Sequence, residues 1–385
     1  MRLMLLTSEF PPGPGGIGHH AYQVARHLCR RGWQVVVLTP QSYATAKEIA
    51  SFNQEQDFSI VRLKEIPGPP IEAFYRVAVL HRWRQRQQPD VLLASGQRAV
   101  WLAAFFTRFA KIPWVAVGHG FEFGVKDPLS RRLNRLTYSQ AHCLISVSAY
   151  TQSRMLGMGI RPKQQVVIHN GADDELFQVL PAESVQRWCR AKGLEAARLL
   201  LTVGNVTERK GQEVVIRALP KIRQSVPDVH YLIAGLPTLK DKLIKIAATL
   251  GVADRVHFLG KVSAEQLVMA YNACDVFVMT SRHASTGDFE GFGIAAVEAA
   301  LCGKPAVVTQ NSGLEEAIQA GRTGLTVPEN NPDATAAAII HLLQNESLRL
   351  EFGHNARQRA LQEQTWSRCV DRYVEVLKMV SQQIQ

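Results

Sequence analysis

The sequence predicts an α/β protein made of two doubly wound, Rossmann-like domains that face a central cleft. Short apolar runs alternate with longer amphipathic segments through the first 170 residues, and the same alternation restarts near residue 199. This alternation is typical of parallel sheets with helices on both faces. The length of 385 residues also suits two domains. Ligands of such sheets bind beyond the carboxyl ends of the strands, so we expect the site in that cleft.

In the first half, strands are expected where short runs are apolar throughout, because strands covered on both faces have no polar side. These runs are Leu3–Thr7, Gln34–Leu38, Val91–Ala94, Trp114–Val117, Leu144–Val147 and Val166–Ile168. Amphipathic segments between them predict helices near residues 18–31, 71–87, 97–109, 129–140 and 148–157.

The second half repeats this pattern after a joining segment, near residues 170–198, that we expect to contain the hinge. Its predicted strands are Leu199–Val203, Tyr231–Ala234, Val256–Phe258, Val276–Met279, Ala306–Val308 and Leu325–Val327. Its predicted helices lie near 211–224, 238–250, 263–273, 293–302 and 333–344. The predicted domains are residues 1–175 and 176–364, and an amphipathic closing helix in 365–385 packs back towards the first domain.

Composition favours a soluble cytoplasmic protein. Hydrophobic residues make up 46% and charged residues 20%, which is ordinary for a globular chain. The longest apolar region, near 99–121, is interrupted by Arg108, Lys111 and Pro113, so no spanning helix is expected. The N-terminal apolar run is too short for a signal peptide. Six scattered cysteines without a Cys-x-x-Cys pair suggest reduced thiols rather than disulfides or a zinc site.

The positive charge is concentrated in the first half. Residues 1–180 hold 21 Lys and Arg against 12 Asp and Glu, whereas the remainder holds 23 against 21. A basic face attracts anionic lipid headgroups or acidic substrates, which predicts peripheral contact with the inner face of the plasma membrane. A solvated surface that keeps the protein soluble explains the charge equally well. No nucleic-acid-binding pattern is present, so nucleic acid is not an expected partner.

The most informative stretch runs from Asp288 to Pro305 and contains two glutamates eight positions apart, Glu290 and Glu298. Glu290 is expected in a loop and Glu298 about one turn inside a helix that begins near Gly293. The N–H groups at that helix start form an anion site, and carboxylates suit sugar hydroxyls. The pattern indicates a pocket for a nucleotide-activated sugar.

Glu298 also has a structural interpretation, as a surface residue of an amphipathic helix. Alanines surround it, however, so the helix is apolar almost all round, as a helix buried against a sheet would be. A glutamate in that setting needs a partner, because an unpaired buried charge is costly.

Two loops of the first domain are candidate parts of the site. Residues 8–20 form a glycine-rich loop that leads into a helix, where bare N–H groups can approach a phosphate. The loop does not fit the spacing Gly-x-Gly-x-x-Gly, which disfavours a nicotinamide dehydrogenase. His119, between two glycines at a strand end, is expected to be exposed and little packed, and thus able to bond a sugar hydroxyl. A histidine that caps a turn is the alternative.

In the second domain, residues 203–211 follow the first strand and bring Arg209 and Lys210 to the mouth of a helix. Lys210 can neutralise a leaving diphosphate, and Arg209 either assists or is solvated. Residues 256–262 place Phe258 beside a backbone turn where a base can stack, unless Phe258 belongs to the core.

With these pieces, the chain resembles the retaining glycosyltransferases of family 4, which have the GT-B fold, and the matching pieces span nearly its whole length. Glu290 followed by seven residues and Glu298 is the most specific of them; the others are Gly15–Gly18, His119–Gly120, Asn170–Asp173, Gly204–Gly211, Ser312–Glu315 and Gly321–Leu325. The resemblance implies donor binding in the second domain and acceptor binding in the first. It also implies that Glu298 holds the ribose, Glu290 the donor sugar, and the Gly293 and Ile294 N–H groups the phosphate, while His119 approaches the transferred sugar.

The predicted site follows from these assignments. The catalytic candidates are His119, Lys210 and Glu290. The donor-binding candidates are Gly16, Gly204, Asn205, Arg209, Lys210, Phe258, Leu259, Val262, Glu290, Gly291, Phe292, Gly293, Ile294 and Glu298. The acceptor-binding candidates are Gly15, Ile17, His119 and Glu122. One departure is Asn205, where the family usually has an arginine that pairs with the lysine on the diphosphate.

The predicted function is transfer of a hexose, with retention, from a nucleoside diphosphate sugar to a saccharide or lipid-linked saccharide in polysaccharide biosynthesis. UDP-glucose is the favoured donor. No Asp-x-Asp pair is present to hold a metal, so no metal or other cofactor is expected. A soluble acceptor such as a sugar phosphate, a silent sugar-nucleotide binding module and a nucleotide-sugar epimerase remain alternatives.

Overall fold

The computed structural model of the protein describes residues 1–13, 15–40 and 44–384. The chain forms two compact units. The first comprises Met1–Asn170 together with Trp366–Gln385, and the second comprises Gly171–Thr365. The first therefore ends a few residues before the position expected from the sequence, and the closing helix belongs to it.

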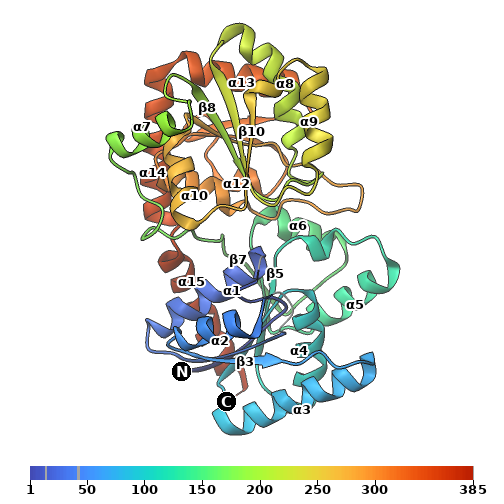
Figure 1. The fold of residues 1–385 in the computed structure, drawn as a ribbon. Coiled ribbons are helices and arrows are strands. Elements are labelled where there is room, and N and C mark those ends of the chain that lie inside the picture. The colour runs from blue at the N-terminus through green and yellow to red at the C-terminus, as the bar shows by residue number, and fades with distance from the viewer. Residues whose placement is uncertain (14, 41–43, 385) are drawn as a thin grey trace. The chain divides into compact units, whose positions relative to one another are not determined.

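The first unit is a seven-stranded parallel sheet with helices on both faces (Figure 1). Its strand order is β3-β2-β1-β4-β5-β6-β7. The strands are β1 (Arg2–Thr7), β2 (Gln34–Pro40), β3 (Ser59–Leu63), β4 (Val91–Ser95), β5 (Trp114–Gly118), β6 (Cys143–Ser146) and β7 (Gln164–Val167). The helices are α1 (Gly16–Cys29), α2 (Ala46–Gln54), α3 (Pro69–Gln87), α4 (Gln97–Ala110), α5 (Pro128–Tyr138), α6 (Ala149–Gly157) and α15 (Trp366–Ser381).

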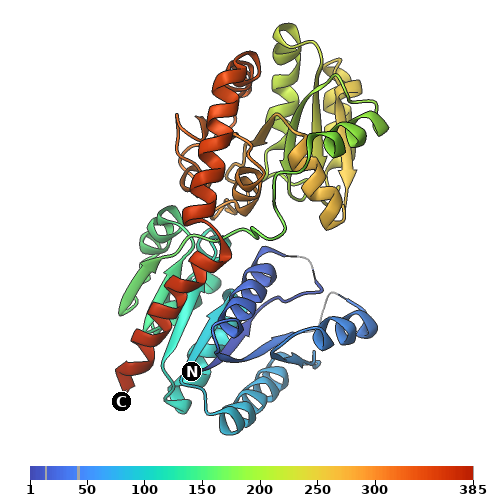
Figure 2. The same ribbon diagram turned by 90° about the vertical axis from the view of Figure 1, so that its left-hand side faces the viewer.

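The last helix, α15, lies beside the strands of the first unit (Figure 2) and contacts α1, β4 and β5. Its buried stripe includes Trp366, Val370, Tyr373 and Leu377, spaced three or four residues apart as one face of a helix requires. Arg31 and Asp371 also form an ion pair, with 2.7 Å between guanidinium and carboxylate.

The second unit is a six-stranded parallel sheet with the order β10-β9-β8-β11-β12-β13. Its strands are β8 (Arg198–Val203), β9 (Val229–Ala234), β10 (Val256–Gly260), β11 (Val276–Met279), β12 (Ala306–Thr309) and β13 (Gly324–Val327). Its helices are α7 (Ala182–Ala191), α8 (Gln212–Ser225), α9 (Lys240–Thr249), α10 (Ala264–Ala273), α11 (Ile294–Leu301), α12 (Leu314–Ala317), α13 (Pro332–Gln344) and α14 (Glu346–Glu363).

The predicted fold class, two Rossmann-like parallel-sheet domains, is confirmed. Five elements were not predicted: β3, α2, α7, α12 and α14. Helix α7 occupies part of the segment that was expected only to join the two halves.

In each unit the strand order reverses at one point. In the first unit β1 lies between β2 and β4, and in the second β8 lies between β9 and β11. The loops that leave the two neighbouring strands at a reversal go to opposite faces of the sheet, which opens a crevice at the carboxyl ends. The loops after β8 and β11 carry most of the predicted donor-binding residues.

Candidate active site

Two glycines bring the loop after β8 against the end of β11. Gly211 precedes α8 with φ +68°, and a Cβ on it would lie 1.8 Å from the Thr280 carbonyl oxygen, so only glycine fits. The Thr280 hydroxyl donates to the Gly211 carbonyl at 2.8 Å. Gly204 stands at the start of the loop, and the side chain of Lys210 lies over it. A Cβ on Gly204 would be 3.0 Å from the lysine Cε. The loop is thus held with Lys210 facing the sheet end.

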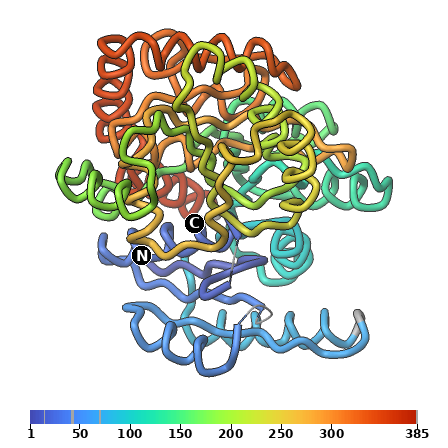
Figure 3. The backbone as a smooth tube through the Cα atoms, turned by 45° about the horizontal axis from the view of Figure 1, so that its top comes forward, coloured from blue at the N-terminus to red at the C-terminus, as the bar shows by residue number. Residues whose placement is uncertain are grey.

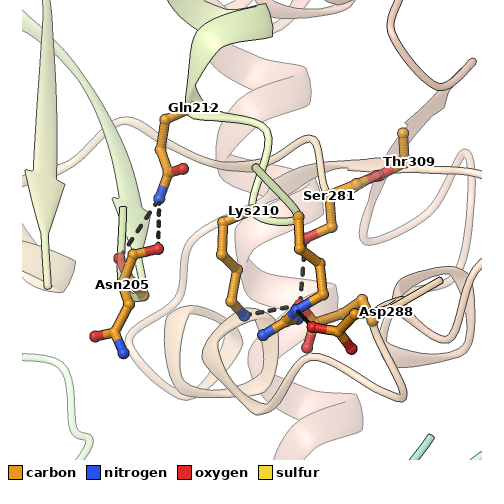
Figure 4. Close-up of polar contacts among 9 residues, drawn as sticks. Asn205, Lys210, Gln212, Ser281, Asp288 and Thr309 are labelled. Carbon is orange, nitrogen blue, oxygen red and sulfur yellow. Dashed lines mark hydrogen bonds and ion pairs between the residues drawn. The ribbon is translucent and has the colours of Figure 1, made fainter. Parts of the chain in front are cut away.

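Glu290, in the loop after β11, is the centre of a polar cluster. Figure 4 labels three other members of this cluster, Lys210, Ser281 and Asp288. Lys210 Nζ lies 2.7 Å from Glu290 Oε2, and the Arg209 guanidinium donates to the same oxygen. The Ser281 hydroxyl donates to it at 3.2 Å. Arg209 also pairs with Asp288, with 2.9 Å from Nε to Oδ2. The Glu290 side chain is only 11% exposed, so these partners hold it in one position.

The cluster keeps Glu290 ionised. Burial raises the pKa of Glu290, but the positive charges of Arg209 and Lys210 outweigh burial and hold this pKa at about 2. Burial lowers the pKa of Lys210, and the charge of Glu290 offsets part of that effect. At neutral pH the site therefore presents a fixed carboxylate with an ammonium and a guanidinium beside it.

The start of α11 adds backbone donors next to Glu290. Gly293, with φ +90°, precedes the helix, and a Cβ on it would lie 2.3 Å from Leu314 Cδ2. The N–H groups of Gly293 and Ile294 donate to no acceptor among the described residues. Gly291 packs tightly against Gly313, where a Cβ would lie 2.0 Å from the Gly291 carbonyl oxygen. The loop before the helix is therefore fixed, and two free donors remain at the positive end of α11.

Glu298 lies in α11 and has the partner that its buried position requires. The Tyr271 hydroxyl, from α10, donates to Glu298 Oε2 at 2.6 Å. Burial raises the pKa of Glu298 to about 7, although the Tyr271 hydrogen bond and the Lys210 charge act in the opposite direction. The charge of Lys210 thus lowers the pKa of both glutamates.

This raised pKa predicts a pH-dependent stability. The folded protein holds the Glu298 proton more tightly than the unfolded chain, whose ordinary value is 4.5. The resulting stability is fully present below about pH 4.5 and is lost as the pH rises through about 7, by up to about 3 kcal/mol. We expect urea unfolding at pH 5 and pH 8 to show a smaller pH-dependent loss in Glu298→Gln than in the wild type. Parallel losses in both proteins would contradict this prediction.

Asn205, the departure from the family pattern, is directed away from Lys210 (Figure 4). Its side-chain oxygen accepts from the Leu236 N–H at 3.3 Å, and its carbonyl accepts from Gln212 at 3.2 Å. Asn205 therefore fastens the loop after β8 to the loop after β9. The second cation of the cluster is Arg209, which is committed to Glu290 and Asp288.

Three other predicted donor residues lie further from the cluster. Phe258 and Leu259 are on β10, which β9 separates from β8, and Val262 follows that strand. Phe258 packs against the hydrophobic core of the unit, as its alternative interpretation supposed, and Lys240 Nζ lies 5.8 Å from its ring centre. The Phe292 side chain is 2% exposed, so that residue can offer a ligand only its backbone.

In the first unit, His119 is half-buried rather than exposed and little packed. Its Nε2 lies 2.9 Å from the Ser95 hydroxyl at the end of β4, and its ring contacts that of His20, with 4.8 Å between centres. Burial lowers the pKa of His119 to about 4, so the ring is neutral at physiological pH. A neutral imidazole both donates and accepts hydrogen bonds, and the packing fixes its orientation.

Glu122, predicted to contact the acceptor, has a structural position instead. Its side chain is fully buried, and its carboxylate accepts from the N–H groups of His119 and Gly120 at 3.0 and 2.8 Å. The Tyr138 hydroxyl donates to it at 3.2 Å. With these bonds the carboxylate shapes the His119 loop from within, and it has no exposed oxygen to offer an acceptor.

Loss of this carboxylate should destabilise the protein. The Glu122→Ala variant leaves two loop N–H groups and a tyrosine hydroxyl without their acceptor, at a cost of about 2–4 kcal/mol in the free energy of unfolding. Urea denaturation measures this cost. Glu65→Ala, at an exposed glutamate of the same unit, is the matched control and should change the free energy by less than about 0.5 kcal/mol. Equal effects of the two substitutions would refute the structural role.

The glycine-rich loop ends at α1. Gly15 has φ +140°, and a Cβ on it would lie 2.0 Å from Glu9 Oε2, which accounts for glycine there. Gly16 begins the helix with open space above it, and Ile17 is half-buried. Burial raises the pKa of Glu9 although the Gly18 N–H bonds to it. The strand register pairs Thr7 of β1 with Ser95 of β4, so this loop begins beside the serine that holds His119.

Sequence reasoning missed five residues that shape these sites: Glu9, Ser95, Tyr271, Ser281 and Asp288. Ser95 and Ser281 stand at or just after strand ends, a position that would have marked them. Tyr271 is distant in sequence from Glu298, and nothing local in the chain connects the two.

In the described part of the chain, no three His, Cys, Asp or Glu side chains are grouped so that they could hold a metal ion. Among those same residues, no helix combines the length and the apolar character needed to cross a membrane.

Two family models match the chain. One, described as a glycosyl transferase 4-like domain, matches residues 15–171, and the other, glycosyl transferases group 1, matches residues 186–359. A GDP-mannose-dependent alpha-(1-6)-phosphatidylinositol monomannoside mannosyltransferase of Mycobacterium tuberculosis is 27% identical over 98% of both chains. An uncharacterized glycosyltransferase of Methanocaldococcus jannaschii is also 27% identical over 98% of both.

Solved structures share the fold. Anabaena HepE, solved in complex with UDP and glucose, has a TM-score of 0.82 at 22% identity, covering 98% of this chain and 100% of that one. The two parallel-sheet units and these matches define a glycosyltransferase with the GT-B fold. The chain belongs to the glycosyltransferases of family 4 type.

Proposed function

We propose that this enzyme transfers a hexose from a nucleoside diphosphate sugar to a hydroxyl of a saccharide or lipid-linked saccharide, with retention of the anomeric configuration. The observation that carries the proposal is the arrangement around Glu290. A buried carboxylate, the Lys210 ammonium and two free N–H groups at the start of α11 occur together at the reversal of the second sheet.

Each group matches one part of a sugar nucleotide. Lys210 and the Gly293 and Ile294 N–H groups bind the diphosphate and stabilise the charge that builds on it as the bond to the sugar breaks. Glu290 binds hydroxyls of the transferred sugar, and Glu298 binds those of the ribose. The acceptor hydroxyl attacks the anomeric carbon on the face that the diphosphate leaves, and its proton passes to a phosphate oxygen.

For the donor, GDP-mannose is the first candidate, because the mycobacterial relatives that align over 97–98% of this chain are named for its use. UDP-glucose, the expectation from the sequence, is the competitor. Donor-dependent thermal stabilisation separates the two, since a ligand that binds only the folded state raises its melting temperature. The donor that stabilises the protein should also be hydrolysed slowly without an acceptor.

Retention and the acceptor are tested on the product. Incubation with the stabilising donor and either a lipid-linked saccharide or a sugar phosphate should yield a glycoside in one case, and NMR of its anomeric proton gives the configuration. An inverted product would overturn the proposed mechanism. Stabilisation by no nucleotide sugar of a broad panel would overturn the proposed function.

We also propose that the reaction needs no metal ion, because Lys210 and the start of α11 supply the positive charge that a cation would otherwise provide. Turnover should be unchanged in excess EDTA. Loss of turnover in EDTA, with recovery on addition of Mg²⁺ or Mn²⁺, would contradict this.

A further inference from the structure

Helices α3, α4 and α5 cover one face of the first sheet. The chain moves from β1 outward to β3 through α1 and α2, then returns across the sheet to β4, β5 and β6 through α3, α4 and α5. Because crossovers between parallel strands are right-handed, the reversal puts these two groups of helices on opposite faces. Helix α4 contacts both α3 and α5, so the three lie next to one another (Figures 1 and 3). We call their outer surface the α3–α5 face.

Large apolar side chains are exposed on every helix of this face. Phe74 on α3 is 78% exposed, Phe109 on α4 is 76% exposed and Leu129 on α5 is 66% exposed. The set is completed by Ile71, Phe105 and Leu136. Elsewhere in the described part of the first unit, the exposed large apolar residues are Met1, Phe121 and Met379, none above 40%. Apolar exposure gathered in this way indicates a surface that is covered in use.

The charge on the α3–α5 face has one sign. Its three helices carry nine arginines and one acidic residue, Glu72. Glu72 pairs with Arg76 at 2.6 Å. Within the described residues, the other eight have no carboxylate partner: Arg82, Arg84, Arg86, Arg98, Arg108, Arg131, Arg132 and Arg135. Most of the positive excess of the first half therefore lies on the helices that expose the apolar side chains.

We propose that the α3–α5 face docks on an anionic lipid bilayer. Arginines attract acidic headgroups, while exposed Phe and Leu side chains insert at the level where headgroups meet acyl chains. Nucleic acid fits less well, because the aliphatic Ile71, Leu129 and Leu136 offer nothing on which a base can stack. This inference rests on the proposed function in one respect: it makes the acceptor of the transferred sugar lipid-borne.

The direct test is flotation of the full chain with vesicles, without donor or acceptor. Binding should be strong to vesicles of phosphatidylcholine with roughly 30% phosphatidylglycerol, because the anionic lipid gives the vesicles a negative surface potential. Binding should be weak to vesicles of phosphatidylcholine alone, and added salt should reduce it.

The double variant Phe105→Ser, Phe109→Ser should weaken binding to the anionic vesicles about tenfold per phenylalanine. Arg131→Gln with Arg132→Gln should weaken it about fivefold per arginine. The control carries Leu350→Ser and Lys245→Glu, at exposed positions of the second unit, and should bind as the wild type.

Several results would overturn the proposal: equal binding to neutral and anionic vesicles, no binding to either, or wild-type binding by both variants. A loss of vesicle binding in the control as large as that in the two variants would also overturn it. Tighter binding of the same face to single-stranded RNA than to anionic vesicles would assign it to nucleic acid instead. Slow donor hydrolysis should be unchanged in both variants, because neither touches the donor site. A protein that binds vesicles but hydrolyses no donor would uphold the docking surface and refute the proposed function.

Discussion

The Glu290→Gln variant should lose at least a hundredfold of kcat/KM for the donor. Glutamine keeps the shape of the side chain. It removes the negative charge that pairs with both Arg209 and Lys210, and it replaces one acceptor oxygen with an NH₂ group. That NH₂ would face cations, so both the position of Lys210 and the hydrogen bonds to the sugar would be lost. Groups that stabilise developing charge typically contribute about 10²–10³ in rate. Initial rates of product formation at varied donor concentration measure the loss.

Two comparisons make this result specific. Glu351→Gln, at an exposed glutamate of α14, should keep wild-type rates. The melting temperature of Glu290→Gln shows whether the protein remains folded, so that lost activity is assigned to the site. If the folded variant kept more than a tenth of the wild-type kcat/KM, Glu290 would not be at the centre of the site.

The Lys210→Met variant should reduce kcat by about 10²–10³ and raise the donor KM less. Lys210 Nζ lies 2.7 Å from Glu290 Oε2, and its proposed interaction strengthens as the leaving diphosphate gains charge. An interaction made mainly in the transition state appears in kcat, whereas uniform binding appears in KM. Methionine keeps much of the aliphatic stem over Gly204, and Arg209 still neutralises Glu290, so the fold should survive.

The matched control is Lys245→Met, at an exposed lysine of α9, which should behave as the wild type. A Lys210→Met enzyme with an unchanged kcat and only a raised KM would show that the ammonium binds donor and transition state equally. That outcome would indicate that the backbone N–H groups at the start of α11, rather than Lys210, stabilise the leaving group.

The sequence predicted the elements whose side chains are apolar throughout. Strands such as β4 and β8 are covered on both faces, so an uninterrupted apolar run identifies them. Strand β3 was missed because it lies at the sheet edge, where only Leu63 is buried and the other positions tolerate polar residues. Helix α14 was missed because its polar residues are spread around the whole helix and its stripe against α11 contains small residues such as Gly353 and Ala356.

The site was predictable where its residues are close in sequence. Glu290, Gly293 and Glu298 form one local pattern, and the need of Glu298 for a partner followed from its alanine neighbours. The identity of that partner, Tyr271, depends on the packing of α10 on α11. Likewise, the roles of Glu122 and Asn205 depend on hydrogen bonds to backbone N–H groups. These bonds cannot be predicted from the spacing of residues in the sequence.

The central claim is that the diphosphate of the donor binds at the start of α11. A crystal structure with an intact nucleoside diphosphate sugar tests it most directly. The account predicts β-phosphate oxygens within about 3.2 Å of the Gly293 or Ile294 nitrogen, with Lys210 Nζ on the same diphosphate and Glu290 on the sugar. A diphosphate bound at any other strand end, with the Gly293 and Ile294 N–H groups still free, would contradict it.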